Sequence, residues 1–212
     1  HYHLLDGLRG VAALVVICYH IGEAFATSFL DQVVNHGYLA VDFFFMLSGF
    51  VIGYAYDERR ETMGIWAFAK RRLIRLHPMV VMGALLGGLT FYAQGCEYWK
   101  VSEVSIGLLI FATLLNMLLV PAWSSVEVRG FGEIFPLNGP TWSLFYEYIA
   151  NALYVLAIRR LSTRWLAGCV FATGGVLFAY ALTNEYGYLG AGWTFADNGF
   201  WGGLLRVMFA FP

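Results

Sequence analysis

Four ionisable side chains lie inside long apolar stretches of this 212-residue chain, namely His20, Glu23, Asp42 and Glu147. A charge within the hydrocarbon of a membrane is expensive, so such residues usually face the protein interior and mark a functional site. Any one of them could instead be a polar contact between two helices. Because four occur together, we treat them as the candidate chemical centre.

His20 has the chemistry of a general base, because imidazole titrates near neutral pH and can take a proton from an attacking hydroxyl. Burial alone disfavours a charged ring, so a carboxylate partner matters. Glu23 follows His20 by three residues and can neighbour it on one helix face. Asp42 is expected at a comparable depth in the next span. Either carboxylate could orient the imidazole.

Arg9 precedes His20 by eleven residues, which is close to three helical turns and a rise of about 16 Å. Both side chains therefore lie on one helix face. They could hold a long anionic ligand that enters from the cytoplasm. The alternative is an arginine that sets the membrane orientation and a histidine that is buried for unrelated reasons.

A second pair of basic residues, Arg72 and Arg75, lies in the segment "KRRLIRLHP". The two arginines are three residues apart and share a helix face, and Pro78 fits a helix start or a change of direction. Guanidinium groups bind phosphate in a bidentate manner, so the pair could clamp a phosphate on the same side of the membrane as Arg9. The alternative is a positive anchor at the cytoplasmic surface.

Ser48 and Gly49 interrupt the aromatic residues of the span "GYLAVDFFFMLSGFVIGYAY". Gly49 is seven residues after Asp42, so it lies on nearly the same face and would let a helix or substrate approach closely. Ser48 lies off that face and has no local base or nucleophile elbow, which favours a polar helix contact over a catalytic nucleophile. In "NGPTWSLFYEYIANALY", Trp142 fits an interfacial position, and Glu147, about two turns deep, could be structural or carry protons.

The elements that must position these residues are membrane helices. The chain is 59% hydrophobic and 13% charged, with a mean hydropathy of +0.64, which is far more apolar than a soluble domain. We expect an all-α polytopic transmembrane helix bundle in one domain, residues 1–212, with about seven spans of roughly 20 residues. They are residues 8–29, 37–56, 78–94, 105–123, 141–158, 165–183 and 199–212, the last of which is expected to be cut off in a fragment of a longer protein.

Other classes fit the composition less well. The apolar runs are continuous rather than alternating, which excludes a β-barrel, and a net charge of −1 argues against nucleic-acid binding. The first span could be a signal peptide, but it is long and has no clear cleavage site. The three cysteines are odd in number and widely spaced, and the five histidines are not clustered, so we expect no metal site and no metal-dependent oxidase.

Basic residues predict the orientation. The segment 57–78 holds six lysines and arginines, whereas the 30–36 loop holds none. This difference predicts that the segment 57–78, Arg9 and the N-terminus lie in the cytoplasm. Counting seven spans onward leaves Arg159, Arg160 and Arg164 on the outer side, against the same rule. Either the rule fails there, or a span near 124–140 has been miscounted.

Four segments in order resemble the acyltransferase 3 family of integral membrane acyltransferases. They are "LDGLRGVAALVVICYH", "GYLAVDFFFMLSGFVIG", "RRLIRLHP" and "NGPTWSLFYEYIANALY", and a weaker match follows at "LLRVMFAF". The resemblance covers essentially the whole chain but implies a domain with further helices. His77 departs from the usual tyrosine before the proline, and Tyr148 replaces the second acid that often follows Glu147.

The resemblance implies a protein of the bacterial inner membrane that moves an acyl group, commonly acetyl from acetyl-CoA, to a hydroxyl of a carbohydrate or another exported molecule. It implies that His20 is catalytic and that Arg9, Arg72, Arg75 and Glu147 are functional. Acyl-CoA is then a co-substrate, and no resident cofactor is expected.

We therefore predict a membrane O-acyltransferase. Arg9, Arg72 and Arg75 would hold the acyl-CoA phosphates, and His20 would act as the base, oriented by Asp42 or Glu23. Ser48, Trp142 and Glu147 complete the candidate site. The alternative is a transporter that uses the intramembrane histidine and carboxylates as a proton relay.

Overall fold

The computed structural model describes residues 2–23, 25–28, 31–56, 63–96, 100–183 and 187–212. The α-helices of this described part are α1 (His3–Glu23), α2 (Leu39–Tyr56), α3 (Ile65–Gln94), α4 (Ile106–Met117), α5 (Thr141–Leu156), α6 (Thr163–Thr183) and α7 (Gly199–Ala210). Within the same residues, strand-like pairing is limited to one isolated bridge between Glu133 and Thr194. The expectation of an all-α protein is confirmed.

Four of the described helices, α1, α2, α3 and α6, are long and apolar enough to cross a membrane. The helices α4 and α7 are apolar but shorter. Large apolar side chains cover the outer surfaces, including Phe171 and Phe178 on α6, and lipid would cover them in turn. The chain is therefore a polytopic helical membrane protein, with four helices of spanning length in place of the seven expected.

Two helices have boundaries that differ from the expected spans. α1 ends at Glu23, because the next residues turn around Asp31, which accepts hydrogen bonds from the backbone N–H groups of Thr27 and Ser28 at 3.1 and 2.9 Å. His20 therefore lies in the last turn of α1 and not near its middle. α3 begins at Ile65, thirteen residues before the expected start, and contains Pro78 in its interior.

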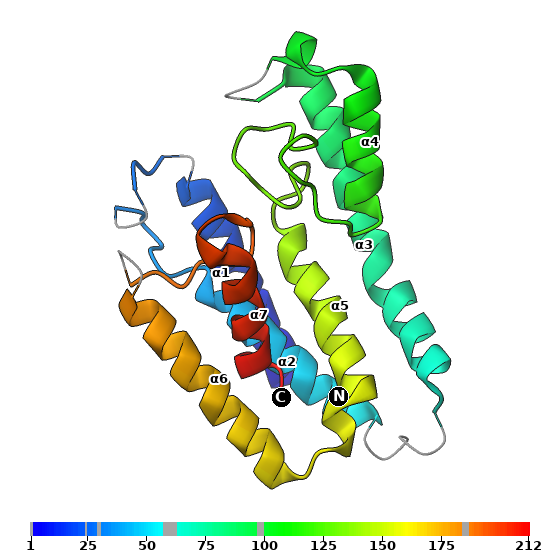
Figure 1. Cartoon of the computed structure of the whole chain (residues 1–212), viewed down its shortest axis with the longest axis vertical. Coiled ribbons are helices and arrows are strands. Elements are labelled where there is room, and N and C mark those ends of the chain that lie inside the picture. The colour runs from blue at the N-terminus through cyan, green and yellow to red at the C-terminus, as the bar shows by residue number, and fades with distance from the viewer. Residues whose placement is uncertain (1, 24, 29–30, 57–62, 97–99, 184–186) are drawn as a thin grey trace.

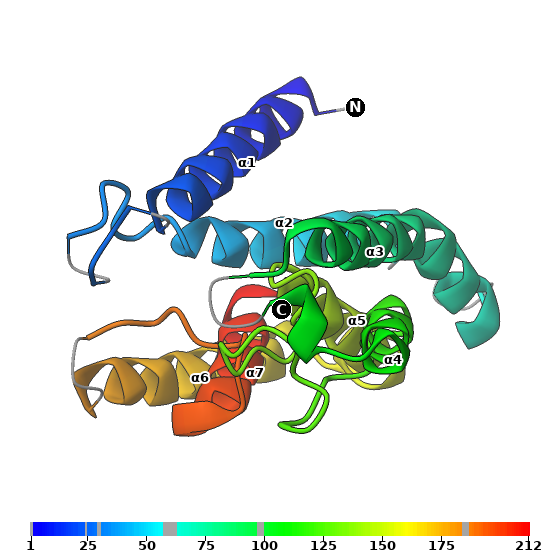
Figure 2. The same ribbon diagram turned by 90° about the horizontal axis from the view of Figure 1, so that it is seen from above.

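α7 lies at the centre of the helix packing. α7 contacts α2, α5 and α6, while α1 packs on α2, and α3 packs on both α4 and α5. Figure 1 shows the N-terminus of α1 and the C-terminus of α7 in the lower part of the molecule. Figure 2 shows that α1 lies on the side of α2 that faces away from α5, α6 and α7. α5 is thus flanked by the two helices, α3 and α7, that carry buried arginines.

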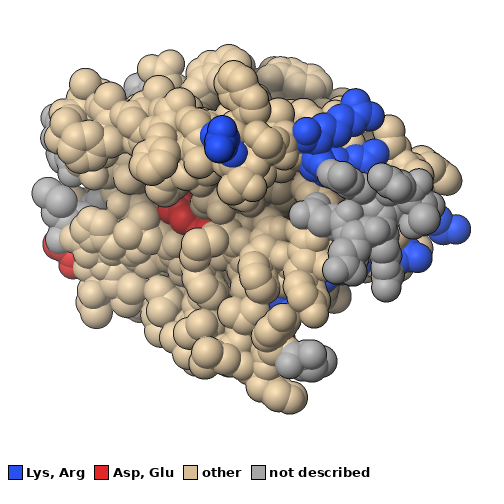
Figure 3. All heavy atoms as spheres, turned by 90° about the horizontal axis from the view of Figure 1, so that it is seen from below, with Lys and Arg blue, Asp and Glu red and all other residues tan. Residues whose placement is uncertain are grey.

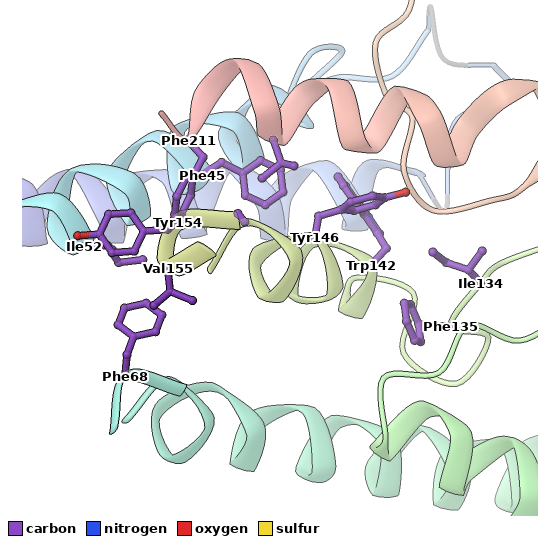
Figure 4. Packing of buried hydrophobic residues seen from close by; sticks show 12 residues of the cluster. Phe45, Ile52, Phe68, Ile134, Phe135, Trp142, Tyr146, Tyr154, Val155 and Phe211 are labelled. Carbon is purple, nitrogen blue, oxygen red and sulfur yellow. The ribbon is translucent and has the colours of Figure 1, made fainter. Parts of the chain in front are cut away.

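The main apolar core lies between α5 and its neighbours. Figure 4 shows Phe45 and Ile52 of α2 gathered with Phe211 near the α5 residues Tyr154 and Val155. Its large, fully buried side chains include Tyr146, Phe45, Phe135, Ile52 and Ile134. This core fixes the relative positions of α2, α5 and α7, which hold Asp42, Ser48, Trp142 and Glu147 of the candidate site.

Two glycines allow backbones to approach closely. A Cβ atom on Gly49 would lie 1.8 Å from the carbonyl oxygen of Phe211, so α7 can pack on α2 only because Gly49 has no side chain. A Cβ atom on Gly87 of α3 would lie 1.6 Å from the carbonyl oxygen of Leu137. Gly49 therefore serves helix packing, one of the two roles expected for it.

α4 and α5 run in the same direction. In Figure 1, α3 rises from the lower end to the top, α4 descends beside its upper part, and α5 starts near mid-height and continues down to the lower end. The chain thus returns to the lower end once between α3 and α6. Arg159, Arg160 and Arg164 consequently lie at the same end as Arg71 and Arg75.

The sequence left two explanations of the conflict open, and this course agrees with the miscounted span, because α4 and α5 together make one return to the lower end. Figure 3 shows lysine and arginine side chains gathered over one part of the lower face. Arg59 and Arg60, which also supported the orientation, lie outside the described residues.

Candidate functional site

A buried ion pair joins α3 to α5. The side chain of Arg72 is 5% exposed, and its Nη2 contacts Oε1 of Glu147, whose side chain is 17% exposed. The Ser48 hydroxyl of α2 donates to the same Glu147 oxygen at 2.8 Å and accepts from Arg72 Nη2 at 3.3 Å. Burying charges costs free energy unless they are paired and hydrogen-bonded, and the ion pair with the Ser48 hydrogen bonds offsets part of that cost.

Arg72 and Arg75 do not form the shared phosphate clamp that their spacing suggested. Arg72 turns into the bundle toward Glu147, whereas Arg75 is exposed. Arg9 is partly exposed in the second turn of α1, where its Nη1 lies 3.4 Å from the Oδ1 atom of Asp6. Of these three arginines, Arg72 is held inside the bundle, whereas solvent can reach Arg9 and Arg75.

A second buried ion pair joins α2 to α7. Arg206, which is 1% exposed, donates from Nε to Asp42 Oδ1 at 2.9 Å and from Nη2 to Asp42 Oδ2 at 3.2 Å. Nη1 also donates to the carbonyl oxygen of Ala191 at 2.8 Å, and Nη2 donates to that of Tyr38 at 2.9 Å. The guanidinium also lies 5.1 Å from the ring centroid of Trp142. Arg206 thus makes four hydrogen bonds and also lies over an aromatic ring.

These contacts revise two expectations. Asp42 was expected near His20, but it forms its ion pair with Arg206. Trp142 was expected at a membrane interface, but it is buried beneath Arg206. Arg206 itself was missed as a site residue, although the argument that a charge is costly within an apolar run applies equally to the segment "LLRVMFAF".

His20 pairs with the other expected carboxylate. Its Nδ1 lies 2.6 Å from Oε2 of Glu23, and the two side chains are 43% and 41% exposed. The ring also makes an edge contact with Tyr19, at 5.3 Å between ring centroids. Glu23 thus engages Nδ1, and no hydrogen bond to Nε2 is seen among the described residues.

Glu133, which the sequence analysis did not single out, is a further buried acid in the segment between α4 and α5. Its carboxylate is 18% exposed, and Oε2 lies 3.2 Å from Nη1 of Arg129. Burial raises the pKa of Glu133 to about 7, because the attraction of Arg129 offsets only part of the cost of ionising a buried carboxyl. The charges of Glu23 and His20 make smaller contributions to this pKa, in opposite directions.

The polar groups thus form three levels. Ser48, Arg72 and Glu147 lie lower in the bundle, and Asp42 with Arg206 lies above them, six residues or about 9 Å away along α2. His20 and Glu23 lie at the upper end of α1. The expected relay residues therefore fall into separate pairs.

The fold and the charged pairs inside the bundle are those of a polytopic helical membrane protein. The model of the acyltransferase 3 family, described as an acyltransferase domain, matches residues 2–212. The chain belongs to this family, and the resemblance drawn from its motifs is confirmed.

Several curated relatives are similar to this chain. Protein 2 in the picA locus of Rhizobium radiobacter is 36% identical over 71% of this chain and 79% of its own length. Acyltransferase MdmB of Streptomyces mycarofaciens is 28% identical over 78% of this chain. A protein of Staphylococcus aureus (strain COL), provisionally named an O-acetyltransferase, is 36% identical over 86% of this chain. The match spans 42% and 30% of the length of these last two relatives. No solved structure matches the chain.

Proposed function

We propose that this chain forms part of a membrane O-acyltransferase that transfers an acyl group, commonly acetyl, from acyl-CoA to a hydroxyl of a carbohydrate or another exported molecule. Membership of the acyltransferase 3 family supports the reaction class. The observation that carries the proposal is the His20–Glu23 contact of 2.6 Å, which engages Nδ1 and leaves Nε2 without a partner among the described residues. The name of the Staphylococcus aureus relative supports acyl transfer to oxygen.

The donor would bind from the lower end, which we assign to the cytoplasm because most of the described basic residues gather there. Arg9 and Arg75 are accessible to phosphate groups. Arg72 is held by Glu147, and its buried Nε has no hydrogen-bond partner among the described residues, so a donor oxygen could satisfy it. An extended thioester arm would then run upward along α1 toward His20, over a rise of about 16 Å.

His20 would act as general base. Its Nε2 takes the proton of the acceptor hydroxyl as the oxygen attacks the thioester carbonyl. The tetrahedral intermediate then expels the CoA thiolate, which takes up a proton, so that the products are an ester and a free thiol. Glu23 holds Nδ1 and stabilises the imidazolium that forms. In this scheme Asp42 positions helices through Arg206, and Ser48 positions Glu147.

The test is reconstitution of the protein in proteoliposomes with labelled acetyl-CoA and hydroxyl-bearing carbohydrates. We expect the label in an ester of the acceptor and an equal release of CoA thiol. Movement of the carbohydrate across the membrane without thiol release would contradict the proposal and support the transporter alternative.

A further inference from the structure

The last turns of α1 are joined to two other segments through Tyr19. The Tyr19 hydroxyl lies 2.7 Å from the hydroxyl of Tyr188, which belongs to the segment before α7 and is 169 residues away in the sequence. The carbonyl oxygen of Tyr19 accepts a hydrogen bond from Nε2 of Gln32, in the segment before α2, at 2.6 Å. Since His20 follows Tyr19 directly, these contacts hold the part of α1 that carries the candidate base.

The Tyr19 side chain is also closely packed. It is 4% exposed, and a Cβ atom on Gly37 would lie 2.6 Å from its Cβ, so the segment before α2 rests directly on it. The Tyr38 ring lies edge-on to the rings of Tyr19 and Tyr188, with centroids 6.2 and 4.7 Å apart, which is a favourable aromatic geometry. Tyr19, Tyr38 and Tyr188 therefore form one cluster, the tyrosine clamp.

The tyrosine clamp rests on the buried ion pair between α2 and α7. Arg206, which is paired with Asp42, donates from Nη2 to the Tyr38 carbonyl oxygen, and its guanidinium lies 5.5 Å from the centroid of the Tyr38 ring. The Tyr38 hydroxyl accepts from the backbone N–H group of Leu189 at 3.3 Å, beside Tyr188. Side chains locked by packing and hydrogen bonds hold their neighbours in place, so the clamp has a firm base.

His20 has few contacts of its own that could place it relative to the other helices. Its side chain is 43% exposed, and its hydrogen bond to Glu23 stays within the end of α1. That bond can orient the imidazole on α1, but it cannot fix where the end of α1 lies. The edge contact between the rings of His20 and Tyr19, with centroids 5.3 Å apart, joins the imidazole to the tyrosine clamp.

We propose that Tyr188 is a positioning residue for His20 that acts through Tyr19, and this rests on the proposed function. The contact between the two tyrosine hydroxyls ties the His20 end of α1 to the segment before α7, so that the imidazole keeps its place as the acceptor hydroxyl arrives. Tyr188 itself exchanges no proton with the substrates. Because a misplacement of about 1 Å can cost about a hundredfold in rate, loss of this contact should lower turnover.

The experiment is steady-state acyl transfer by Tyr188→Phe in proteoliposomes, with labelled acetyl-CoA and a hydroxyl-bearing carbohydrate that the wild type esterifies. The variant keeps the aromatic ring and removes only the hydroxyl. We expect kcat to fall by about tenfold to hundredfold, with the KM for acetyl-CoA unchanged, because the arginines proposed to bind the donor lie elsewhere. Tyr92→Phe is the matched control, since Tyr92 is an exposed tyrosine of α3, and it should keep the wild-type kcat.

A double variant separates positioning from stability. Removing one hydroxyl leaves the other without this partner, whereas removing both can be nearly neutral for stability. Tyr19→Phe combined with Tyr188→Phe should therefore melt close to the wild-type temperature and still show the low kcat of either single variant, because both changes break the same contact. Recovery of the wild-type kcat together with the melting temperature would overturn the proposal.

His20→Ala distinguishes this proposal from the proposed function. If His20→Ala stays fully active, the proposed function is wrong. If it is inactive while Tyr188→Phe has the wild-type kcat and KM, only the role of Tyr188 is wrong. Adding Tyr188→Phe to His20→Ala should not reduce the residual turnover further. A further loss in that background would show that Tyr188 does not act through His20.

Discussion

At the scale of single residues, two buried arginines organise the interior. Arg72 binds Glu147 and Ser48 between three helices, and Arg206 binds Asp42 between two. The apolar sequence around Asp42 indicated that its charge needs a partner, but that partner, Arg206, lies 164 residues away in the sequence. The local pattern could therefore identify the acid and not its partner. His20 and Glu23, three residues apart, were predictable as neighbours because helical periodicity is local.

Asp42→Asn should strongly destabilise the protein, because it leaves Arg206 buried without a counter-charge. Breaking a buried pair from one side costs about 3–5 kcal/mol. Thermal unfolding of the detergent-solubilised protein measures the loss. Asp6→Asn is the control, since the Asp6–Arg9 pair is exposed and such pairs contribute under about 1 kcal/mol. Equal melting temperatures for the two variants would show that the buried pair does not stabilise the bundle.

At the scale of helices, the apolar runs predicted how many helices form and roughly where. The error at α3 arose from Pro78, which suggested a helix start, although a proline within a helix removes one hydrogen bond and need not end it. His20 lies in the last turn of α1 and not in the middle of a helix over 8–29, because α1 ends at Glu23, before a turn in which Asp31 accepts from Ser28. The contact of Ile134 with Trp193 joins distant segments, and no local pattern indicates it.

Gly49→Ala tests how α2 packs against α7. The new Cβ atom would lie 1.8 Å from the Phe211 carbonyl oxygen, so one helix must shift, at a cost of roughly 1–3 kcal/mol. A lower melting temperature and reduced turnover are expected, because the shift separates Asp42 from Arg206. Gly10→Ala is the control, because nothing lies within 4 Å of its added Cβ and alanine favours a helix. A Gly49→Ala protein as stable as the Gly10→Ala protein would contradict this packing.

At the scale of the whole molecule, the shared direction of α4 and α5 brings the basic segments to one end. Hydropathy suggested one crossing for each apolar run, but α4 has 12 residues and stops beside α3. The positive charges near α6 gave the only sequence signal of this arrangement, as a conflict with the expected count.

Cysteine labelling from each side of the membrane tests this topology in a background without native cysteines. Gly64→Cys and Ser162→Cys should react with an impermeant reagent from the same side, and Val33→Cys from the opposite side. All three positions are exposed. If Ser162→Cys reacts together with Val33→Cys, then α4 and α5 each cross the membrane and the arrangement described above is wrong.

The most direct test of the central claim is acyl transfer by His20→Ala in reconstituted membranes. Loss of a positioned base should slow turnover by about 10² to 10⁴ without a change in melting temperature, because His20 is nearly half exposed. His36→Ala, which removes another exposed histidine near the same end, should keep the wild-type rate. Full acyl transfer by His20→Ala would contradict the assignment of His20 as the base.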